Sequence, residues 1–199
     1  MNDRLRFFRA AAARWDEHHP SELTRAGVLR GLDLLGPLER RTVVDVGCGT
    51  GAVVGPLLER IGDGTVTGID FAPEMIARAR SRYSDARARY LECDVLDVDL
   101  APGSVDVVTC YNAFPHFPHP ERVVSLFARW LRPGGVAAVW HDATSVAIAE
   151  IHRRIGGAIG RDVPYPTGVL AAMFDRRGFR LARADEAGGA YTVLATREA

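Results

Sequence analysis

Short apolar runs alternate with amphipathic stretches along the middle of the chain. The runs are rich in β-branched residues, as is typical of strands that are covered on both faces. They span residues 41–47, 64–70, 88–94, 104–112 and 135–142. Residues 52–62, 72–83 and 120–135 have helical spacing, with proline near the start or glycine at the end. Strands that alternate with helices predict a parallel sheet wound by right-handed crossovers.

The C-terminal region breaks this rhythm. A predicted helix over residues 168–179 is followed by strand-like runs at 179–187 and 190–198, with only a short turn between them. A turn that short permits an antiparallel hairpin but no parallel crossover. We therefore predict an α/β fold, with a mostly parallel seven-stranded sheet, helices on both faces and an antiparallel C-terminal strand.

Three more stretches are predicted to be helical and lie outside this alternation. Residues 4–15 and 22–35 precede the first strand, and residues 144–160 follow the fifth. The third stretch lies between the fifth strand and the last long helix. We therefore expect residues 144–160 to be a helical insertion above the sheet, over the active site.

Composition is that of an ordinary soluble globular protein, with 47% apolar and 25% charged residues. The formal net charge of zero argues against a nucleic-acid partner, and no apolar run approaches the ~20 residues of a membrane span. The three cysteines lie in or beside apolar runs, and the N-terminus has no apolar block of signal-peptide type. We therefore expect a cytoplasmic protein with free thiols and no membrane partner.

A glycine-rich turn, VVDVGCGTGA, ends the first strand and opens the next helix. Gly47, Gly49 and Gly51 let the backbone turn tightly and let a ligand approach closely. Ligands of open α/β sheets bind at the carboxyl ends of the strands, where the strand order reverses. The first strand is usually that point, so we expect a nucleotide-like ligand here.

Two kinds of nucleotide cofactor fit this turn. Gly47, Gly49 and Ala52 satisfy the dinucleotide pattern G-x-G-x-x-G/A, and Asp70 could hold ribose hydroxyls in either case. Asp45, two residues before the first glycine, suits a ligand with a cationic end and would repel a pyrophosphate. A further carboxylate at the end of the third strand and the terminal hairpin also weigh against a dinucleotide.

At these residues the chain resembles the class I S-adenosylmethionine-dependent methyltransferases. VVDVGCGTG corresponds to the first motif of that family and GID to the acidic end of its second strand. CDVLD corresponds to its adenine-contacting segment and LRPGG to the turn before its fifth strand. The resemblance covers residues 40–197 and is uninformative about the methyl acceptor.

The resemblance implies where S-adenosylmethionine would bind. Gly47, Gly49 and Gly51 would frame the cofactor, and Asp45 would lie near its methionine amino group. The remaining contacts would come from the ends of the second, third and fourth strands.

Five residues at those strand ends have implied roles of their own. Asp70 would accept hydrogen bonds from the ribose hydroxyls. Asp94 would accept from the adenine amino group, with the amide of Val95 beside it. Tyr111 and Asn112 would close over the methionine end of the cofactor.

The segment ARWDEHH, before the sheet, resembles a tryptophan-containing helix that many of these enzymes fold across the cofactor. Trp15 is therefore a candidate lid residue, with core packing as the alternative. We expect residues 1–36 to form an N-terminal helical lid and residues 37–199 to form the S-adenosylmethionine-binding methyltransferase domain.

Histidines gather on the predicted acceptor side of this domain. His116 follows the fourth strand in the segment YNAFPHFPHPER, His141 ends the fifth strand, and His152 lies on the inserted helix. Prolines interrupt the helical spacing of His116 and His119, so only one of that pair is expected to face inward. We favour His116.

Three roles for these histidines compete. His116 or His141 could be a general base for an O–H or N–H acceptor, or could bind the substrate. His116, His141 and His152 could instead bind a divalent metal that activates the acceptor. All three could also be structural. The resemblance does not decide among these roles, because the family has no fixed histidine trio.

Aromatic residues bound the choice of acceptor. Phe114, Phe117, Trp140 and Tyr165 are expected to form an aromatic wall. We therefore predict methyl transfer to a small, aromatic or heterocyclic acceptor. The alternatives are an NAD(P)-dependent oxidoreductase and a metal-binding, cofactor-binding protein without methyl transfer. The sequence leaves a homodimer open.

Overall fold

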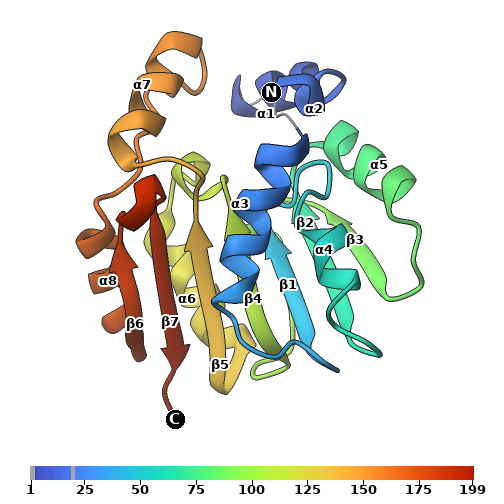
Figure 1. Ribbon diagram of the computed structural model, residues 1–199, viewed down its shortest axis with the longest axis vertical. Helices are drawn as coiled ribbons and strands as arrows, with labels where there is room; N and C mark the ends of the chain where they lie inside the picture. Colours follow the sequence, from blue (N-terminus) through green and yellow to red (C-terminus); the bar gives the residue numbers. More distant parts are fainter. Residues whose placement is uncertain (1–2, 19–20) are drawn as a thin grey trace.

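One open sheet of seven strands forms the centre of the computed structural model, which describes residues 3–18 and 21–199 (Figure 1). The strand order is β3-β2-β1-β4-β5-β7-β6. The strands are β1 (Thr42–Val46), β2 (Thr65–Asp70), β3 (Ala88–Glu92), β4 (Val105–Tyr111), β5 (Leu131–Trp140), β6 (Phe179–Asp185) and β7 (Thr192–Arg197). Residues 1, 2, 19 and 20 of the predicted lid lie outside the described residues.

The strand pairing confirms the predicted fold class. β1 pairs in parallel with both β2 and β4, and β3 and β5 extend the parallel sheet on either side. β7 is antiparallel to both of its neighbours, β5 and β6. The short connection between β6 and β7 accounts for this reversal, because a hairpin cannot join parallel strands.

Helices of the described residues connect the strands and extend beyond them. They are α1 (Asp3–Ala12), α2 (Trp15–His18), α3 (Ser21–Asp33), α4 (Val54–Leu58), α5 (Pro73–Arg82), α6 (Pro120–Trp130), α7 (Ser145–Ile155) and α8 (Thr167–Asp175). Short 3-10 helices are η1 (Val95–Asp97), η2 (Phe114–His116) and η3 (Ala187–Gly189).

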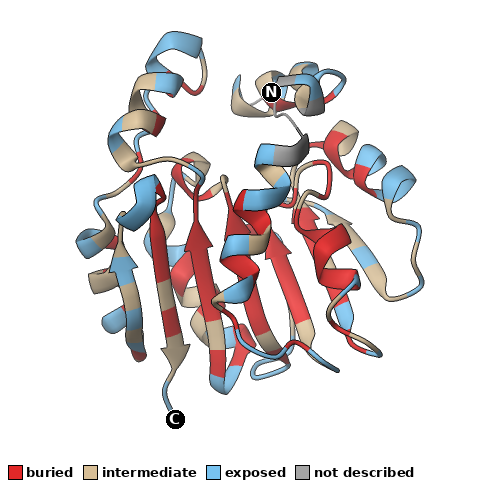
Figure 2. Cartoon of the chain, viewed as in Figure 1, coloured by how far each residue is buried: buried red, intermediate tan, exposed pale blue. Residues whose placement is uncertain are grey.

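Two apolar clusters hold the helices on opposite faces of the sheet. Helices α3, α4 and α5 pack on one face, where Val28, Leu57 and Ile76 are fully buried. Helices α6 and α8 pack on the other face through Phe127 and Phe174. Figure 2 shows the central strands as the most continuously buried part of the chain. Although α3 falls within residues 1–36, its buried face is part of this core.

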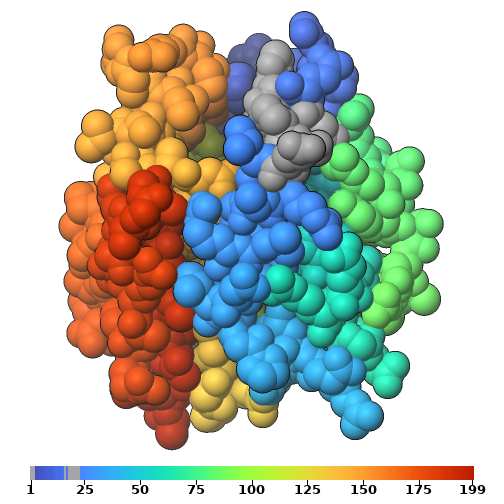
Figure 3. All heavy atoms as spheres, in the orientation of Figure 1, coloured from blue at the N-terminus to red at the C-terminus, as the bar shows by residue number. Residues whose placement is uncertain are grey.

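A third, smaller cluster lies beyond the carboxyl ends of the parallel strands. Phe8 and Ala12 of α1 pack there against Met75 of α5 and against Ile159, which follows α7. Figures 1 and 3 show the N-terminal residues in blue and α7 in orange, both at this end of the sheet. Segments from distant parts of the sequence therefore gather above the edge where the glycine turn lies.

Several helices end earlier than the sequence predicted, and for two of them the structure shows the reason. The helix predicted over residues 144–160 is α7, which ends at Ile155 because Gly156 and Gly157 adopt positive φ angles of 69° and 56°. Similarly, α6 ends at Trp130, since Leu131 already pairs with Val105 as part of β5.

The structure also bears on membranes and thiols. Within the described ranges, no helix has both the length and the apolar character needed to span a membrane.

Cys48, Cys93 and Cys110 are free. Burial raises the pKa of the Cys48 and Cys110 thiols well above the ordinary value, which keeps both protonated.

Two helical glycines allow a test of how closely α3 packs on the sheet. A Cβ at Gly31 would lie 2.2 Å from the Trp140 ring, whereas a Cβ at Gly168, in α8, meets nothing within 4 Å. We expect Gly31→Ala to lower the free energy of unfolding by ~1–3 kcal/mol through overpacking. Gly168→Ala is the control and should raise it by up to ~1 kcal/mol. Urea unfolding measures both, and equal stability of the two variants would contradict the packing.

Candidate functional site

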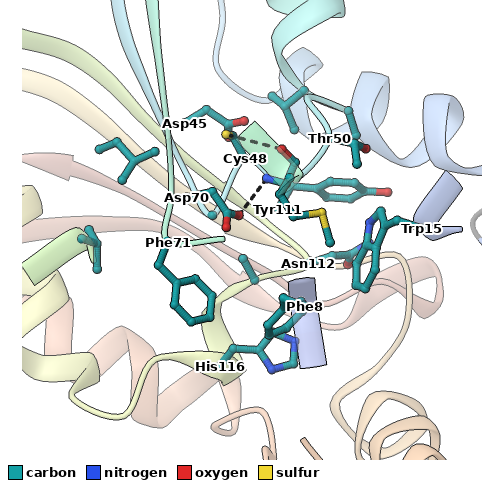
Figure 4. Close-up of a pocket in the computed structure, with 18 of the residues that line it drawn as sticks. Phe8, Trp15, Asp45, Cys48, Thr50, Asp70, Phe71, Tyr111, Asn112 and His116 are labelled. Atoms are coloured by element: carbon teal, nitrogen blue, oxygen red, sulfur yellow. Dashed lines mark hydrogen bonds between the residues drawn. The ribbon is translucent and has the colours of Figure 1, made fainter. Parts of the chain in front are cut away.

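A cavity of about 280 Å³ lies at the carboxyl ends of the central strands (Figure 4). Its walls come from the glycine turn after β1, the ends of β2 and β4, the segment after β3, and helix α1. Nine of the predicted site residues are among those that line it: Asp45, Gly47, Gly49, Asp70, Asp94, Val95, Tyr111, Asn112 and His116. The parallel strands thus bring these residues to one place.

Backbone hydrogen bonds to β2 hold the glycine turn in place. The amides of Gly47 and Cys48 both donate to the carbonyl of Ile69, over 2.8 and 3.0 Å. Gly47, Gly49 and Gly51 all have positive φ, which side-chain-bearing residues rarely adopt. A Cβ at Gly47 would lie 2.4 Å from that of Ala113, while a Cβ at Gly49 would meet nothing within 4 Å. Packing therefore requires Gly47, and the backbone at Gly49 stays open to a ligand.

Gly51 has a different neighbour. A Cβ there would lie 3.0 Å from the Tyr83 ring, and Gly51 is not among the residues that line the cavity. Gly51 lies on the side of the turn that faces Ala79 and Tyr83, so the lack of a side chain allows α5 to pack closely. The framing role implied for Gly51 would therefore be indirect.

Asp45 carries an unsatisfied carboxylate oxygen. Its side chain is buried, and Oδ1 accepts a hydrogen bond from the Thr109 hydroxyl at 2.8 Å, while Oδ2 has no hydrogen-bond partner among the described residues. Burial raises the pKa of Asp45 to about 7, and the charge of nearby Asp70 adds to the effect. A buried carboxylate without a counter-charge is costly, so this position suits the ammonium group of a ligand.

Asp70 supports the glycine turn. One carboxylate oxygen accepts from the Gly49 amide at 3.0 Å and the other from the Ala72 amide at 2.9 Å. Burial raises the pKa of Asp70 to about 6, although these backbone hydrogen bonds oppose the rise. Each oxygen has a second lone pair, so Asp70 could also accept from ligand hydroxyls. Its structural and ligand-binding roles are therefore compatible.

Asp94 and Val95 form the wall after β3. Asp94 is exposed and caps η1 by accepting a hydrogen bond from the Leu96 amide at 2.9 Å. Val95 is buried beside it. Asp94 lines the cavity, and its second carboxylate oxygen has no hydrogen-bond partner among the described residues.

Asp142 forms hydrogen bonds with Tyr111, the last residue of β4, and with Asn112, which follows it. It accepts hydrogen bonds from the Tyr111 hydroxyl and from the Asn112 side chain, the latter at 3.1 Å. Its own amide donates to Asn112 Oδ1 at 3.2 Å. Asn112 has a positive φ of 51°, so this network stabilises an uncommon backbone conformation. The sequence did not single out Asp142.

Of the three histidines predicted at the site, His116 lines the cavity. Its Nδ1 lies 2.9 Å from the carboxylate of Asp162, which also pairs with Arg4 of α1. Burial lowers the pKa of His116, and the hydrogen bond to Asp162 partly offsets this. His119, three residues on, is exposed. Imidazole at the cavity is therefore neutral near physiological pH and able to take up a proton.

His141 and His152 are not among the residues that line the cavity. His152 is buried, and its Nδ1 pairs with the backbone carbonyl of Asp162. His141 is buried against the Tyr191 ring, and burial lowers its pKa to about 3. The described residues contain no group of three His, Cys, Asp or Glu side chains that could hold a metal ion. The three-histidine metal site is therefore not supported.

The aromatic lining differs from the expected wall. Phe114 and Trp140 are buried in the two cores, where the sheet and its helices need apolar bulk. Phe117 does line the cavity. Tyr165 packs against the larger core instead.

Rings from the N-terminal helices and from Phe71, directly after β2, replace the missing part of that wall. Phe8 packs against Phe71, Trp15 and the His116 ring with centroid separations of 5.8, 5.8 and 5.0 Å (Figure 4). Phe8 and Phe71 follow no motif in the sequence, and Asp162 lies 46 residues from His116. Only the folded chain brings these residues together.

Known proteins with similar sequences are methyltransferases. The profile of a family described as "methyltransferase domain" matches residues 43–135. The nocamycin O-methyltransferase of Saccharothrix syringae is 33% identical over 77% of this chain and 63% of its own length. An uncharacterized methyltransferase of Mycobacterium bovis is 32% identical over 61% of this chain and 67% of its own length.

A solved structure shares the fold. The S-adenosylmethionine-dependent methyltransferase from Aquifex aeolicus matches with a TM-score of 0.75 over 94% of this chain and 97% of its own, at 22% identity. None of these matches lends support to an NAD(P)-dependent oxidoreductase. The chain spans a little under two thirds of the Saccharothrix protein, which is longer.

Asp45→Asn tests the electrostatic fit of the site. The folded-state pKa of about 7 exceeds the ordinary 3.8, so the stability that Asp45 contributes below pH 3.8 is lost as pH rises through about 7. At about pH 8 we expect the ligand-free variant to be more stable than the wild type. It should nevertheless bind S-adenosylhomocysteine at least ~10-fold more weakly, a loss of ~1.4 kcal/mol.

Urea unfolding and calorimetric titration give these two values. Asp106→Asn is a matched control, because Asp106 pairs with Arg41 and Arg132 at the opposite end of the sheet. It should leave the affinity for S-adenosylhomocysteine unchanged. Unchanged affinity in Asp45→Asn would contradict the fit.

Proposed function

Because the chain belongs to the S-adenosylmethionine-dependent methyltransferases of the class I, Rossmann-like fold, we propose that it transfers a methyl group to a hydroxyl of a small acceptor. One observation carries the proposal: His116 and the glycine turn with Asp45 line the same cavity. A proton acceptor and a cation-binding carboxylate therefore face a shared space. The O-methyltransferase relative supports a hydroxyl as the acceptor group.

The residues around the glycine turn fit S-adenosylmethionine. Asp45 Oδ2 would accept from the ammonium group, which supplies the missing partner and counter-charge. Asp70 would accept from the ribose hydroxyls and stay bonded to the Gly49 amide. Asp94 and the Val95 amide would contact the adenine. When bound, the cofactor supplies an electrophilic methyl group.

Tyr111 and Asn112 would lie at the methionine end of the cofactor. Asp142 holds both side chains, and the Tyr111 hydroxyl also reaches the Thr24 carbonyl of α3 at 3.4 Å. Burial and the hydrogen bond to Asp142 raise the pKa of Tyr111, so its hydroxyl remains a donor. These residues would act by fixing the shape of the site.

His116 would act on the acceptor. Its Nε2 would take the hydroxyl proton as the acceptor oxygen bonds to the methyl carbon and the carbon–sulfur bond breaks. His141 is a poor candidate base, because its low pKa makes the imidazole a weak proton acceptor. We assign His152 a supporting role, since it bonds the backbone of Asp162. No metal is needed for this division of roles.

The aromatic rings around the cavity suit a flat acceptor. Phe8, Phe71 and Phe117 line it together with Trp15. Ring faces and edges bind planar apolar molecules well. An aromatic or heterocyclic compound bearing a hydroxyl is therefore the proposed acceptor.

The N-terminal helices and the insertion after β5 would control access to the cavity. We propose that α1 and α2 form the lid part of residues 1–36, and that the 144–160 insertion extends over the acceptor side. Phe8 and Trp15 line the cavity from these helices, and Arg4 reaches across to Asp162. Exclusion of water by such a cover would favour the transfer. A cytoplasmic location and a homodimer stay predictions.

Methyl transfer from labelled S-adenosylmethionine to a panel of small phenols and hydroxylated heterocycles tests this function. We expect turnover of at least one phenol, and a fall of ~10²–10⁴-fold in kcat for His116→Ala at unchanged affinity for S-adenosylhomocysteine. His119→Ala is the matched control and should keep full turnover, because that imidazole is exposed. Activity in the wild type should also fall as the pH drops through the pKa of His116.

Two results would count against the proposal. Full turnover in His116→Ala would remove the base from the mechanism. Thermal stabilisation by NAD and not by S-adenosylhomocysteine would favour the oxidoreductase alternative over methyl transfer.

A further inference from the structure

Asp162 is a buried carboxylate that joins three separate parts of the chain. Its side chain is 1% exposed and lies in the loop between α7 and α8. Oδ2 accepts from Arg4 Nε at 3.0 Å and lies 2.9 Å from His116 Nδ1, and Oδ1 pairs with the Arg4 guanidinium. The backbone carbonyl of Asp162 pairs with His152. No sequence motif marks this residue.

We propose that Asp162 is a positioning residue for the reaction: it fixes the tautomer and orientation of His116 so that Nε2 can take the acceptor proton. This inference rests on the function proposed above and deepens it. Asp162 itself does not touch the cavity.

The hydrogen-bonding chemistry leaves one tautomer. An ionised carboxylate only accepts hydrogen bonds, so His116 Nδ1 must carry the proton that it shares with Asp162. Burial alone would raise the pKa of Asp162, but its hydrogen bonds to His116 and Arg4 lower it on balance. Asp162 therefore stays ionised, and Nε2 of His116 holds the free lone pair.

Nε2 is also accessible. It has no hydrogen-bond partner among the described residues. It is also not fully buried, because a fully buried atom without a partner would be left unsatisfied, as Asp45 Oδ2 is. His116 lines the cavity, while its Nδ1 is bonded to Asp162 outside the lining. The lone pair is therefore available to a ligand.

The charge on Asp162 would also matter once a proton moves. Imidazolium formed at His116 would lie beside a carboxylate and be stabilised by it. The other groups that face His116 act in the opposite direction: Arg4 from α1 by its positive charge, and His152 from α7. His141, at the end of β5, is neutral because its pKa is about 3. Among the described groups that act on His116, Asp162 is the one anion.

The ion pair with Arg4 raises a competing explanation. Arg4 and Asp162 also connect α1 to the loop after α7, so Asp162 could serve only to hold the cover closed. The two explanations differ in what they predict for His116. If the ion pair only holds the cover closed, removing Arg4 and removing Asp162 should have the same effect on His116. If Asp162 orients His116 by its charge, the two removals should have different effects.

The wild-type protein gives the first test. Nitrogen-15 NMR of the full chain, with His116 assigned by comparison with His116→Gln, reports which ring nitrogen carries the proton. We expect the Nδ1–H tautomer. An Nε2–H tautomer at His116 would overturn the proposal, and this result needs no variant of Asp162.

Two variants then separate positioning from latching. Asp162→Asn removes the anion, so the pKa of His116 should fall. Arg4→Gln removes the cation from the same ion pair, so the pKa of His116 should rise. NMR titration measures both. Shifts in the same direction, or no shift in Asp162→Asn, would overturn the positioning role.

Turnover supplies the final comparison. Asp162→Asn should lower kcat by ~10-fold or more, up to the loss seen in His116→Ala, with the affinity for S-adenosylhomocysteine retained. Its pH–rate profile should move to lower pH together with the His116 titration. Unchanged kcat in Asp162→Asn, while His116→Ala is inactive, would overturn the role of Asp162 alone. Full activity in His116→Ala would overturn the base proposed for the reaction itself.

Discussion

The parallel pairing of β1 with both β2 and β4 is the constraint on which the site depends. The chain runs from β1 towards β3 on one side and from β4 towards β6 on the other, so the strand order reverses beside β1. A crevice opens at the carboxyl ends at such a point. The turn from Gly47 to Gly51 occupies it, held by the carbonyl of Ile69 and the carboxylate of Asp70. The positions of the surrounding site residues follow from this geometry.

The two buried carboxylates at and behind the cavity are compensated unequally. Asp162 has Arg4 and His116 as partners and stays ionised, whereas Asp45 has a lone hydroxyl partner and a raised pKa. A protein that buries an uncompensated carboxylate loses stability unless a ligand supplies the counter-charge. Asp45, which lines the cavity, is therefore prepared for a cationic ligand, whereas Asp162, outside the lining, already has its partners. His116 joins Asp162 to the cavity.

The sequence predicted the sheet and the glycine turn at its edge for a physical reason. Strands buried on both faces leave continuous apolar runs, and the tight turn requires glycine, so both leave a local pattern around Asp45 and Gly47. The acceptor side depends on contacts between distant segments. Nothing local distinguishes Phe8, Phe71 or Asp162, and Trp140 was placed in the wall although α3 covers it. Such contacts become visible only when the tertiary structure is known.

We propose that cofactor and acceptor share one cavity, with Asp45 at one end and His116 at the other. A crystal structure of the complex with S-adenosylhomocysteine is the most direct measurement. We predict that the ammonium group lies within hydrogen-bond distance of Asp45 Oδ2 and that the sulfur faces the part of the cavity lined by His116. A nucleoside bound elsewhere, or a sulfur directed away from His116, would contradict it.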